Sequence, residues 1–428
     1  MKLDCNFEIN NKIIRSETYL EQKQDDCSIV ATVLPYEIIP DLTLDCSLVS
    51  VIDSSELLLD KTSGFIDETI HNHIIKGNTQ ERKVKLASAK LVSKNPPKAH
   101  DTVLVQIYLT NIPYPFCVNN IPYPFDSLIL TREQEGKEPE IYQTDFTINI
   151  TGQPKVVIKP HSEGAISHIL EVDGVTFAEL NNVIELIDSI SFLISFASGC
   201  MCSIARIQVL HDRKTVHLEY ISPENTKLKE GNKLIYREED VIQFIESTYI
   251  DYRLKVDIYK LKKLIELGIL AKNTPYIENK TILICNFLEI LRYNYALNVG
   301  HFNQKRGDFY WADKRTTSKV SFNEILKDFC QTNNLQGWID DYTKIRNEIV
   351  HQGEVIGNNS MEKIKNYLEL HHFCDRVTLT LLNWDRVSGY YIPINKKQYK
   401  AMNGIAVNRI EFNRKRVEQN STIFNIFL

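Results

Sequence analysis

A change of hydrophobic period near the middle of the chain constrains the fold more than any other feature. Up to about residue 225, short segments rich in β-branched residues alternate with Asp, Asn, Pro and Gly, as in strands joined by turns. From residue 238, apolar residues recur every three or four positions, as in amphipathic helices. The 428 residues therefore predict an α+β protein with a β-rich domain (1–225), a linker (226–237) and a helix bundle (238–428).

One helix is expected inside the β-rich half. Thr176 can cap it while Glu179 reaches back in a capping box, and Gly199 can end it. Its apolar stripe predicts a helix packed on the sheet: Leu180, Val183, Ile184, Ile187, Ile190 and Ile194. The serines within this segment make it too polar for a bilayer span, so no membrane association is expected.

The strands and the later helices are assigned by the same two periods. The clearest strands are at 27–36, 84–92, 102–109, 145–150 and 155–160, and a hairpin joins 205–210 to 215–221. The long helical patterns are at 238–255, 279–297, 322–332, 335–352 and 361–384. Between the second and third of these helices, residues 301–320 form an expected loop that mixes basic and aromatic residues.

The charge balance excludes a chain that coats nucleic acid with positive charge along its whole length. Lys and Arg number 50 against 55 Asp and Glu, which gives a formal net charge of −5. Positive charge is instead concentrated in the tail from residue 386, with eight basic residues against two acidic ones. The nine cysteines are scattered along the chain, and their odd number would leave at least one thiol unpaired. This favours free thiols in a reducing cytoplasm.

Several common catalytic signatures are absent from the sequence. It contains no Walker or dinucleotide-type glycine loop, no HExxH, no paired CxxC and no GxSxG elbow, so we expect neither a metal nor another cofactor. The nearest approaches to metal-ligand spacing are Cys200 with Cys202 and His71 with His73, and both are interpreted as structural. Of His371 and His372, one is expected in the core and the other in solvent.

The segment KIRNEIVHQG contains the one set of residues with catalytic chemistry. A buried seam of Trp338, Tyr342, Ile345 and Ile349 leaves three polar residues off the core: Arg346, Asn347 and His351. Asn347 and His351 are four residues apart and share a helix face, so Asn347 can orient His351. Gly353 can cap the helix, which places His351 in the last turn. Histidine can transfer protons near neutral pH, and arginine can neutralise a phosphodiester.

This R-N-x-x-x-H string, followed by another long helix, resembles the HEPN superfamily (higher eukaryotes and prokaryotes nucleotide-binding domains). The resemblance covers residues 238–390, and the β-rich first half resembles the layout of the ApeA-type anti-phage HEPN proteins. It implies a metal-independent endoribonuclease in which the RNA 2'-hydroxyl attacks the adjacent phosphate and leaves a cyclic phosphate. Arg346, Asn347 and His351 would carry the reaction, with Glu289 in support.

The resemblance also implies partners. The active site would form in a homodimer, the substrate would be RNA with tRNA as the expected class, and the first domain would sense a phage protein. Bases could stack on aromatic residues of the 301–320 loop while basic residues meet phosphate. The candidate RNA contacts are Lys305, Arg306, Tyr310, Trp311, Lys314 and Arg315.

Three alternatives remain open at the level of sequence. Arg346 could simply pair with a carboxylate while His351 ends its helix, and Glu289 could be an ordinary surface carboxylate. The bundle could be a non-catalytic module for RNA binding or dimerisation. The aromatic loop at 113–125, which contains part of a repeated NIPYPF segment, could bind a sugar or a peptide.

Overall fold

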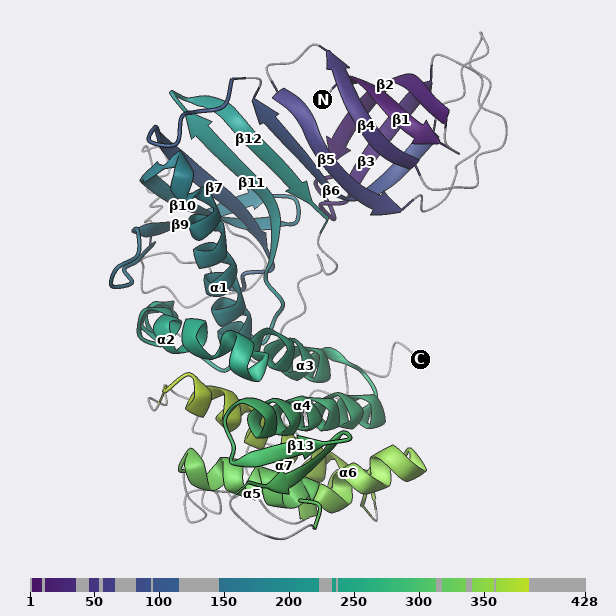
Figure 1. Cartoon of the computed structure of the whole chain (residues 1–428), viewed down its shortest axis with the longest axis vertical. Helices are drawn as coiled ribbons and strands as arrows, with labels where there is room; N and C mark the ends of the chain where they lie inside the picture. The colour runs from purple at the N-terminus through teal and green to yellow at the C-terminus, as the bar shows by residue number, and fades with distance from the viewer. Residues whose placement is uncertain are drawn as a thin grey trace, which may run out of the picture. The chain divides into compact units, whose positions relative to one another are not determined.

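A computed structural model describes most of the chain outside its C-terminal tail. The described residues are 2–9, 12–35, 46–53, 57–65, 82–93, 95–114, 146–222, 233–235, 238–312, 318–335, 341–357 and 359–384. Strands dominate the first half and helices the second, which confirms the α+β class (Figure 1). Contacts divide the chain into two compact units, Met1–Lys233 with Glu238–Tyr249, and Leu234–Arg237 with Ile250–Leu428.

The first unit is built on one antiparallel sheet of 12 strands. Its spatial order is β4-β1-β2-β3-β6-β12-β11-β7-β10-β9-β8, and β5 pairs with β6. The strand bounds are β1 Lys2–Ile9, β2 Lys12–Gln22, β3 Ile29–Pro35, β4 Cys46–Asp53, β5 Leu57–Phe65, β6 Arg82–Ser93, β7 Thr102–Thr110, β8 Phe146–Ile148, β9 Val156–Glu163, β10 Ile166–Thr176, β11 Ser203–His211 and β12 Lys214–Ile221. All five strands singled out from the sequence are present.

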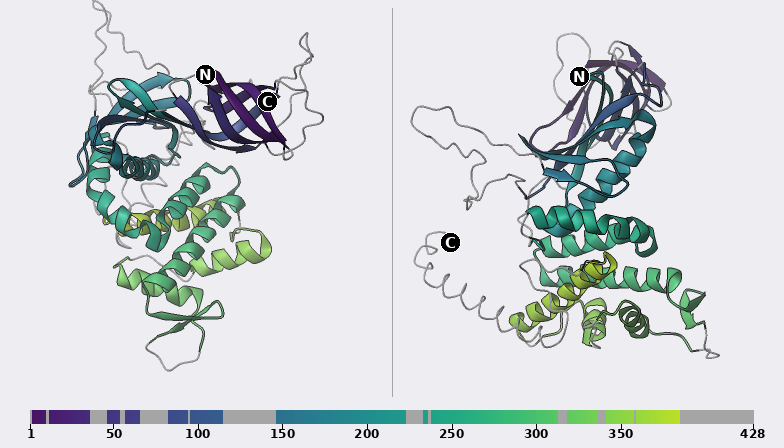
Figure 2. Two further views of the ribbon diagram at one scale, coloured as in Figure 1. Left: turned by 45° about the horizontal axis from the view of Figure 1, so that its top comes forward. Right: turned by 90° about the vertical axis from the view of Figure 1, so that its left-hand side faces the viewer.

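Strand β6 joins the two parts of this sheet. Its first half, Arg82–Leu86, pairs with β3, and its second half, Ser88–Val92, pairs with β12. Strand β5 pairs with the other edge of β6 over most of its length. The sheet is therefore continuous but has two portions, which β6 joins (Figure 2). The first portion holds the strands before β6 in the spatial order, and the second holds those after it.

The expected helix packs on the second portion of the sheet. A short 3-10 turn, η1 (Phe177–Glu179), leads into α1 (Leu180–Ser198), which contacts β7, β10 and β11. Thr176 and Glu179 form the predicted capping box, and Gly199 takes the left-handed conformation at the C-terminus. Serines buried in α1 bond back to the carbonyl groups of the preceding turn, as Ser195 Oγ does to Ser191 (2.7 Å). A helix containing serines can therefore lie in the core.

The closing hairpin β11–β12 is also present as expected. Its strands pair antiparallel up to His211 and Lys214, which leaves Asp212 and Arg213 as the two turn residues. Both have positive φ angles, 48° and 63°, which is the geometry of a type I′ turn.

The turn between β9 and β10 fits closely against another part of the unit. Gly164 has a φ of +62°, and a Cβ built on it would collide with the backbone carbonyl of Gln24. The next residue, Ala165, donates its N–H to the same Gln24 carbonyl oxygen (2.6 Å). Glycine is required there for its conformation and also for the space it leaves.

Helix α2 (Glu238–Tyr259) begins within the first unit. Val241, Phe244 and Ile245 are buried, and the Phe196 and Phe244 rings lie 6.1 Å apart. Glu246 Oε1 accepts a hydrogen bond from the Asn149 backbone N–H (2.7 Å). The expected bundle boundary at residue 238 thus differs from the contact boundary, because the first turns of α2 are packed on the first unit. Most of the expected linker lies outside the described residues.

The second unit is helical, with one short hairpin. Its elements are the rest of α2, α3 (Leu261–Asn273), α4 (Ile277–Asn298), β13 (Phe302–Lys305), β14 (Asp308–Trp311), α5 (Phe322–Thr332), α6 (Asp341–Gln352) and α7 (Ser360–Leu381). Helix α4 contacts α3, α5, α6 and α7, so it is the central helix of this unit. Its fully buried residues include Phe287 and Leu288, which directly precede Glu289.

Two elements of this unit differ from the expectations. Helix α3 was not predicted as a separate helix, and it follows Lys260, whose φ of +57° breaks the chain away from α2. The segment 301–320 was expected to be a loop, but its first part is the hairpin β13–β14 with Arg306 and Gly307 at the turn.

A buried ionic cluster ties α3 to α7. Lys272 Nζ lies 3.2 Å from Asp375 Oδ1, and His371 Nδ1 lies 3.5 Å from Asp375 Oδ2. Burial alone would raise the pKa of Asp375, but Lys272 and His371 together bring that pKa well below its ordinary value. His371 is buried and His372 is exposed, as predicted for this pair. The cluster is a structural pairing of charges within the bundle core.

Candidate active site

Helix α6 presents the candidate residues because its other face is buried. Tyr342, Ile345 and Ile349 lie in the core, which confirms the predicted seam for these three residues. Trp338, the fourth, lies outside the described residues. Gly353 has a φ of +75° and donates its N–H to the Ile349 carbonyl oxygen (3.1 Å), so it ends the helix as expected. His351 therefore lies in the last turn of α6, as expected.

Arg346 is held by Glu289 of α4, the residue expected to support the site. Arg346 Nη2 lies 2.6 Å from Glu289 Oε1, and Arg346 Nε donates to the same oxygen at 3.1 Å. The two side chains are 26% and 31% exposed, so the ion pair is partly shielded while remaining open to solvent on one side. Residues 57 positions apart in the sequence are thus brought into direct contact.

A second arginine, which the sequence reasoning missed, shares this carboxylate. Arg292 Nε lies 3.1 Å from Glu289 Oε2, so each carboxylate oxygen faces one arginine. One carboxylate between two guanidinium groups leaves a local excess of one positive charge. The signal that could have found Arg292 is its spacing of three residues from Glu289 on one helix face.

Aromatic rings flank the two arginines. The Phe322 ring centre of α5 is 5.4 Å from the Arg346 guanidinium carbon and 5.8 Å from that of Arg292. The Phe309 ring centre of β14 is also 5.8 Å from the Arg292 guanidinium carbon. At these distances the rings can stabilise the guanidinium groups by cation–π interaction, which uses none of the guanidinium N–H donors.

Asn347 contacts Arg346. Its Oδ1 accepts a hydrogen bond from Arg346 Nη1 (3.0 Å), so the side-chain amide helps to fix the guanidinium. Within the part of the chain that the structure describes, no hydrogen bond joins Asn347 to His351. Both residues are exposed on α6, and the orientation of His351 by Asn347 is therefore not a feature of the single chain.

Cys285 lies one turn before Glu289 on α4 but is not a candidate nucleophile. It packs with Ile349 and Val355 in a small apolar cluster. Burial raises the pKa of its thiol to about 12, with Arg346 lowering and Glu289 raising it by smaller amounts. At neutral pH the thiol is protonated, so the chemistry of the site depends on arginine, carboxylate and imidazole.

The hairpin β13–β14 carries four of the expected RNA contacts. Lys305 and Arg306 are exposed at its turn, whereas Tyr310 and Trp311 are half-buried. The Trp311 ring packs on Phe302 at 4.7 Å, so this tryptophan covers the hairpin itself. Lys314 and Arg315 lie outside the described residues.

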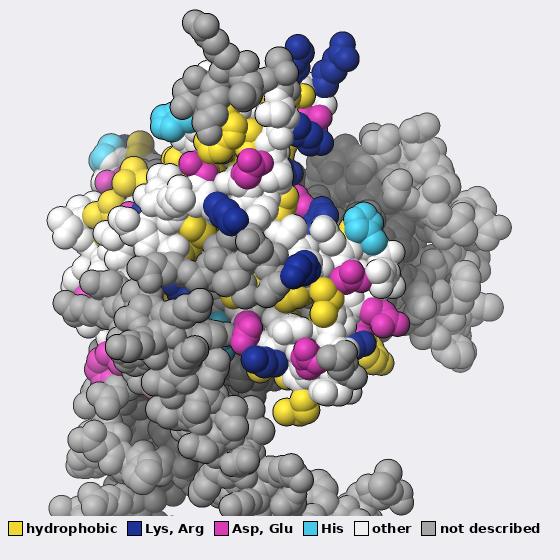
Figure 3. Space-filling view, turned by 90° about the horizontal axis from the view of Figure 1, so that it is seen from below, with side chains coloured by type: hydrophobic (Ala, Val, Ile, Leu, Met, Phe, Trp, Pro, Cys, Tyr) yellow, Lys and Arg dark blue, Asp and Glu magenta, His cyan; other side chains and the backbone are white. Residues whose placement is uncertain are grey.

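The surface seen in Figure 3 does not form one continuous basic area. In the described part of this face, Lys and Arg side chains alternate with Asp and Glu. A local excess of positive charge, such as the one at the two arginines, would therefore have to position a phosphate on its own.

The described residues contain no group of three or more His, Cys, Asp or Glu side chains able to hold a metal ion. Cys202 is buried with its Sγ 3.4 Å from the Asn111 carbonyl oxygen, which supports the structural interpretation of Cys200 and Cys202. His71 and His73 lie outside the described residues.

One helix in the described part of the chain, Phe177–Ser198, is long and apolar enough to cross a bilayer. Two thirds of its apolar window (67%) is buried within the protein, as in a core helix.

No family model, no curated protein and no solved structure matches the chain.

Proposed function

We propose that the chain is a metal-independent endoribonuclease of the HEPN type, with its active site at Arg346, His351 and their neighbours. The observation that carries the proposal is the arrangement on α6 and α4. Glu289 and Asn347 hold Arg346 in place, while an exposed histidine lies in the last turn of the same helix. An arginine can bind a phosphodiester, and an exposed imidazole on the same helix can transfer a proton.

In the proposed reaction the RNA 2'-hydroxyl loses its proton and attacks the adjacent phosphorus. The P–O5' bond breaks, the leaving oxygen takes up a proton, and the products carry a 2',3'-cyclic phosphate and a 5'-hydroxyl. His351 acts as general acid or base at one of these oxygens. Arg346 neutralises the charge that develops on the phosphorane-like transition state, and Arg292 adds a second positive group.

The reaction needs both an acid and a base, and each chain offers one candidate histidine on α6. A homodimer would supply the second one if two copies of the helix face each other. Val350, next to His351, is 52% exposed and would be covered if two copies of α6 faced each other. The proposed substrate is RNA, and tRNA is the proposed class. The chain would act in the cytoplasm during anti-phage defence, and its first unit would sense a phage protein.

The test is RNA cleavage in EDTA by the full chain and two variants, His351→Ala and Arg346→Ala, with total tRNA as substrate. We expect the wild type to leave cyclic phosphate ends and both variants to lose cleavage at least a hundredfold, with unchanged melting temperature and mass. His100→Ala is the matched control, because His100 is an exposed histidine of the first unit. The same proteins are compared in phage-infected cells, where a trigger is present.

The competing function is a non-catalytic module for RNA binding or dimerisation. The ion pair between Arg346 and Glu289 also fits this non-catalytic function, because such pairs occur in purely structural settings. Full cleavage by both variants, or no cleavage by the wild type in vitro and in infected cells, would replace the nuclease assignment with this one.

A further inference from the structure

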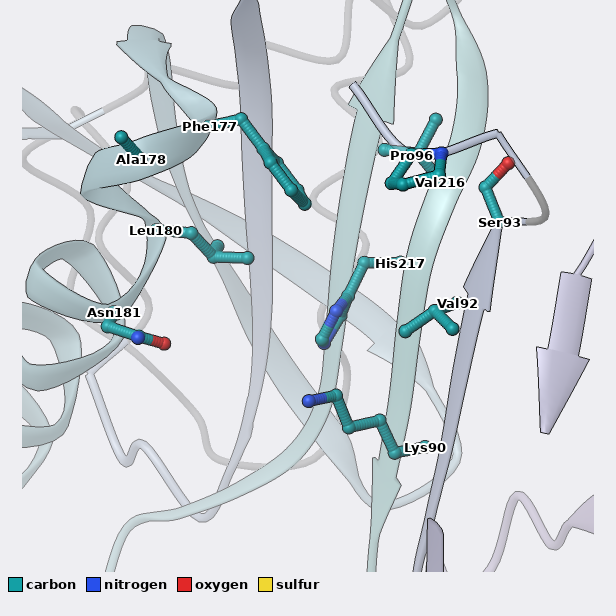
Figure 4. A pocket seen from close by; sticks show the side chains of 10 residues that line it. All are labelled: Lys90, Val92, Ser93, Pro96, Phe177, Ala178, Leu180, Asn181, Val216 and His217. Carbon is teal, nitrogen blue, oxygen red and sulfur yellow. The ribbon is translucent and has the colours of Figure 1, made fainter. Parts of the chain in front are cut away.

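The first unit contains a pocket whose residues are distant in sequence from those of the candidate active site. It lies between the strands β6 and β12 on one side and the start of the η1–α1 helix on the other (Figure 4). Its volume is about 380 Å³, which is enough for a small organic molecule. Side chains from both sides point toward this space in Figure 4, among them Phe177 and Asn181 from the helix and His217 from β12.

His217 is the polar side chain that this pocket leaves without a hydrogen bond. The residue is 5% exposed, and its Nε2 has no hydrogen-bond partner. The nearest carboxylate oxygen, Glu219 Oε2, lies 3.7 Å from Nε2, which is too far for a hydrogen bond. Buried polar groups are rarely left without a hydrogen bond, so a ligand with an acceptor atom in the pocket would satisfy the imidazole Nε2.

A positive charge lies next to His217. In the pairing of β6 with β12, Val92 is opposite His217 and Lys90 is opposite Glu219, so Lys90 and His217 are on the same face of the sheet. Figure 4 shows the Lys90 ammonium group beside the His217 ring at the pocket. The residues that line the pocket include this lysine and this histidine but no Asp or Glu. Glu219, opposite Lys90 on the same face and 3.7 Å from His217 Nε2, lies just outside this lining and offsets part of the positive charge.

The remaining wall is mostly apolar. Val92, Pro96, Leu180 and Val216 line it together with the Phe177 ring, which Figure 4 shows across the space from His217. Ligand pockets typically combine such a wall with a few polar groups that fix orientation. The chemistry of this pocket matches a molecule with one apolar or aromatic body and one anionic end.

We propose that this pocket binds a small organic anion, with the anionic group at Lys90 and His217 and the apolar body against Phe177. The inference is independent of the nuclease proposal, because it uses only residues of the first unit. Carboxylates and phosphate monoesters share the required chemistry, and the experiment separates them.

The test uses the full chain and three probes in isothermal titration: phenyl phosphate, benzoate and benzyl alcohol. We expect at least one anionic probe to bind with a Kd on the order of 1 mM, as its few non-hydrogen atoms allow, and benzyl alcohol to bind at least tenfold more weakly. Lys90→Met should weaken the anion about tenfold. Lys214→Met is the matched control, because this exposed lysine of β12 does not line the pocket.

A second measurement does not depend on the folding of a variant. In the wild type labelled with ¹⁵N-histidine, the imidazole nitrogens of His217, assigned by loss of their signals in His217→Gln, should shift when the anionic probe is added. The proposal is overturned if no anionic probe binds, if Lys90→Met and Lys214→Met bind it equally, or if the His217 signals stay unchanged at saturation. Loss of RNA cleavage in the active-site variants would not bear on these outcomes.

Discussion

Glu289 links two arginines at the candidate active site. One of its oxygens faces Arg346 and the other faces Arg292, and both guanidinium groups lie near the Phe322 ring. The carboxylate therefore determines where the two positive charges lie, although it cannot bind phosphate itself. Sequence reasoning reached Glu289 and Arg346 but not Arg292, because an i,i+3 ion pair on a helix is common at any surface.

At the scale of single residues, we predict that Arg292→Met weakens RNA binding while Arg346 and His351 remain in place. Removing one phosphate-contacting cation should lower the slope of log Kd against log salt concentration by about one. The measurement is fluorescence anisotropy with labelled tRNA at several salt concentrations, in the inactive His351→Ala background. Lys263→Met, which removes an exposed charge paired with Glu266, should leave the slope as it is. An unchanged slope in Arg292→Met would remove Arg292 from the RNA-binding surface.

The buried carboxylate of Asp375 gives a prediction about acid stability. Because its pKa is lower in the folded chain than in the unfolded chain, the folded state gains stability above the unfolded pKa of about 3.9 and loses it as the pH falls below that value. Asp375→Asn should cost on the order of 3 kcal/mol at pH 7 and should flatten the fall in unfolding free energy between pH 5 and pH 3. Urea unfolding at each pH measures this, and the exposed Asp257→Asn provides the control.

At the scale of elements, the capped and strongly periodic segments were predictable from sequence. The capping box at Thr176, the apolar stripe of α1 and the buried seam of α6 are all local patterns that packing reinforces. Helix α3 was missed because Gly268 interrupts its pattern and because nothing in the sequence marks the break at Lys260. The hairpin β13–β14 was missed because each strand has only four residues and Arg–Gly is a weak turn signal.

Two glycines in the helical unit should respond in opposite directions to the same substitution. Gly353→Ala places a Cβ at a φ of +75° and should lower the unfolding free energy by about 1 kcal/mol, although the space around it is open. Gly268→Ala lies within α3, also in open space, and should raise the unfolding free energy by up to about 1 kcal/mol. Chemical denaturation measures both. Equal effects in the two variants would contradict the assigned end of α6.

At the scale of the whole molecule, the pairing of strands far apart in the sequence could not be derived from local patterns. Nothing in β6 indicates that one strand would pair with β3, β5 and β12 at once. The contact between α4 and α6 that brings Glu289 to Arg346 is of the same kind, since it depends on which helices pack together. The residue types of the site were therefore predictable from the sequence, whereas the contacts between their side chains were not.

Self-association is the corresponding prediction for the complete chain. If two copies form the active site, Val350→Lys should halve the mass measured by light scattering and reduce cleavage in parallel, because a charge replaces an exposed apolar contact beside His351. Ile250→Lys, at an equally exposed apolar position on α2, is the control. A wild type that has the mass of one chain and still cleaves RNA would rule out a site shared between two copies.

The close fit at Gly164 has a genetic consequence. All four glycine codons begin with GG, so every single-nucleotide missense change there produces Ala, Val, Asp, Glu, Ser, Arg, Cys or Trp. Each of these residues brings a Cβ into the position occupied by the Gln24 carbonyl. A saturation library should therefore recover no tolerated missense codon at 164, whereas Gly152, with a similar φ but open space around it, should accept several.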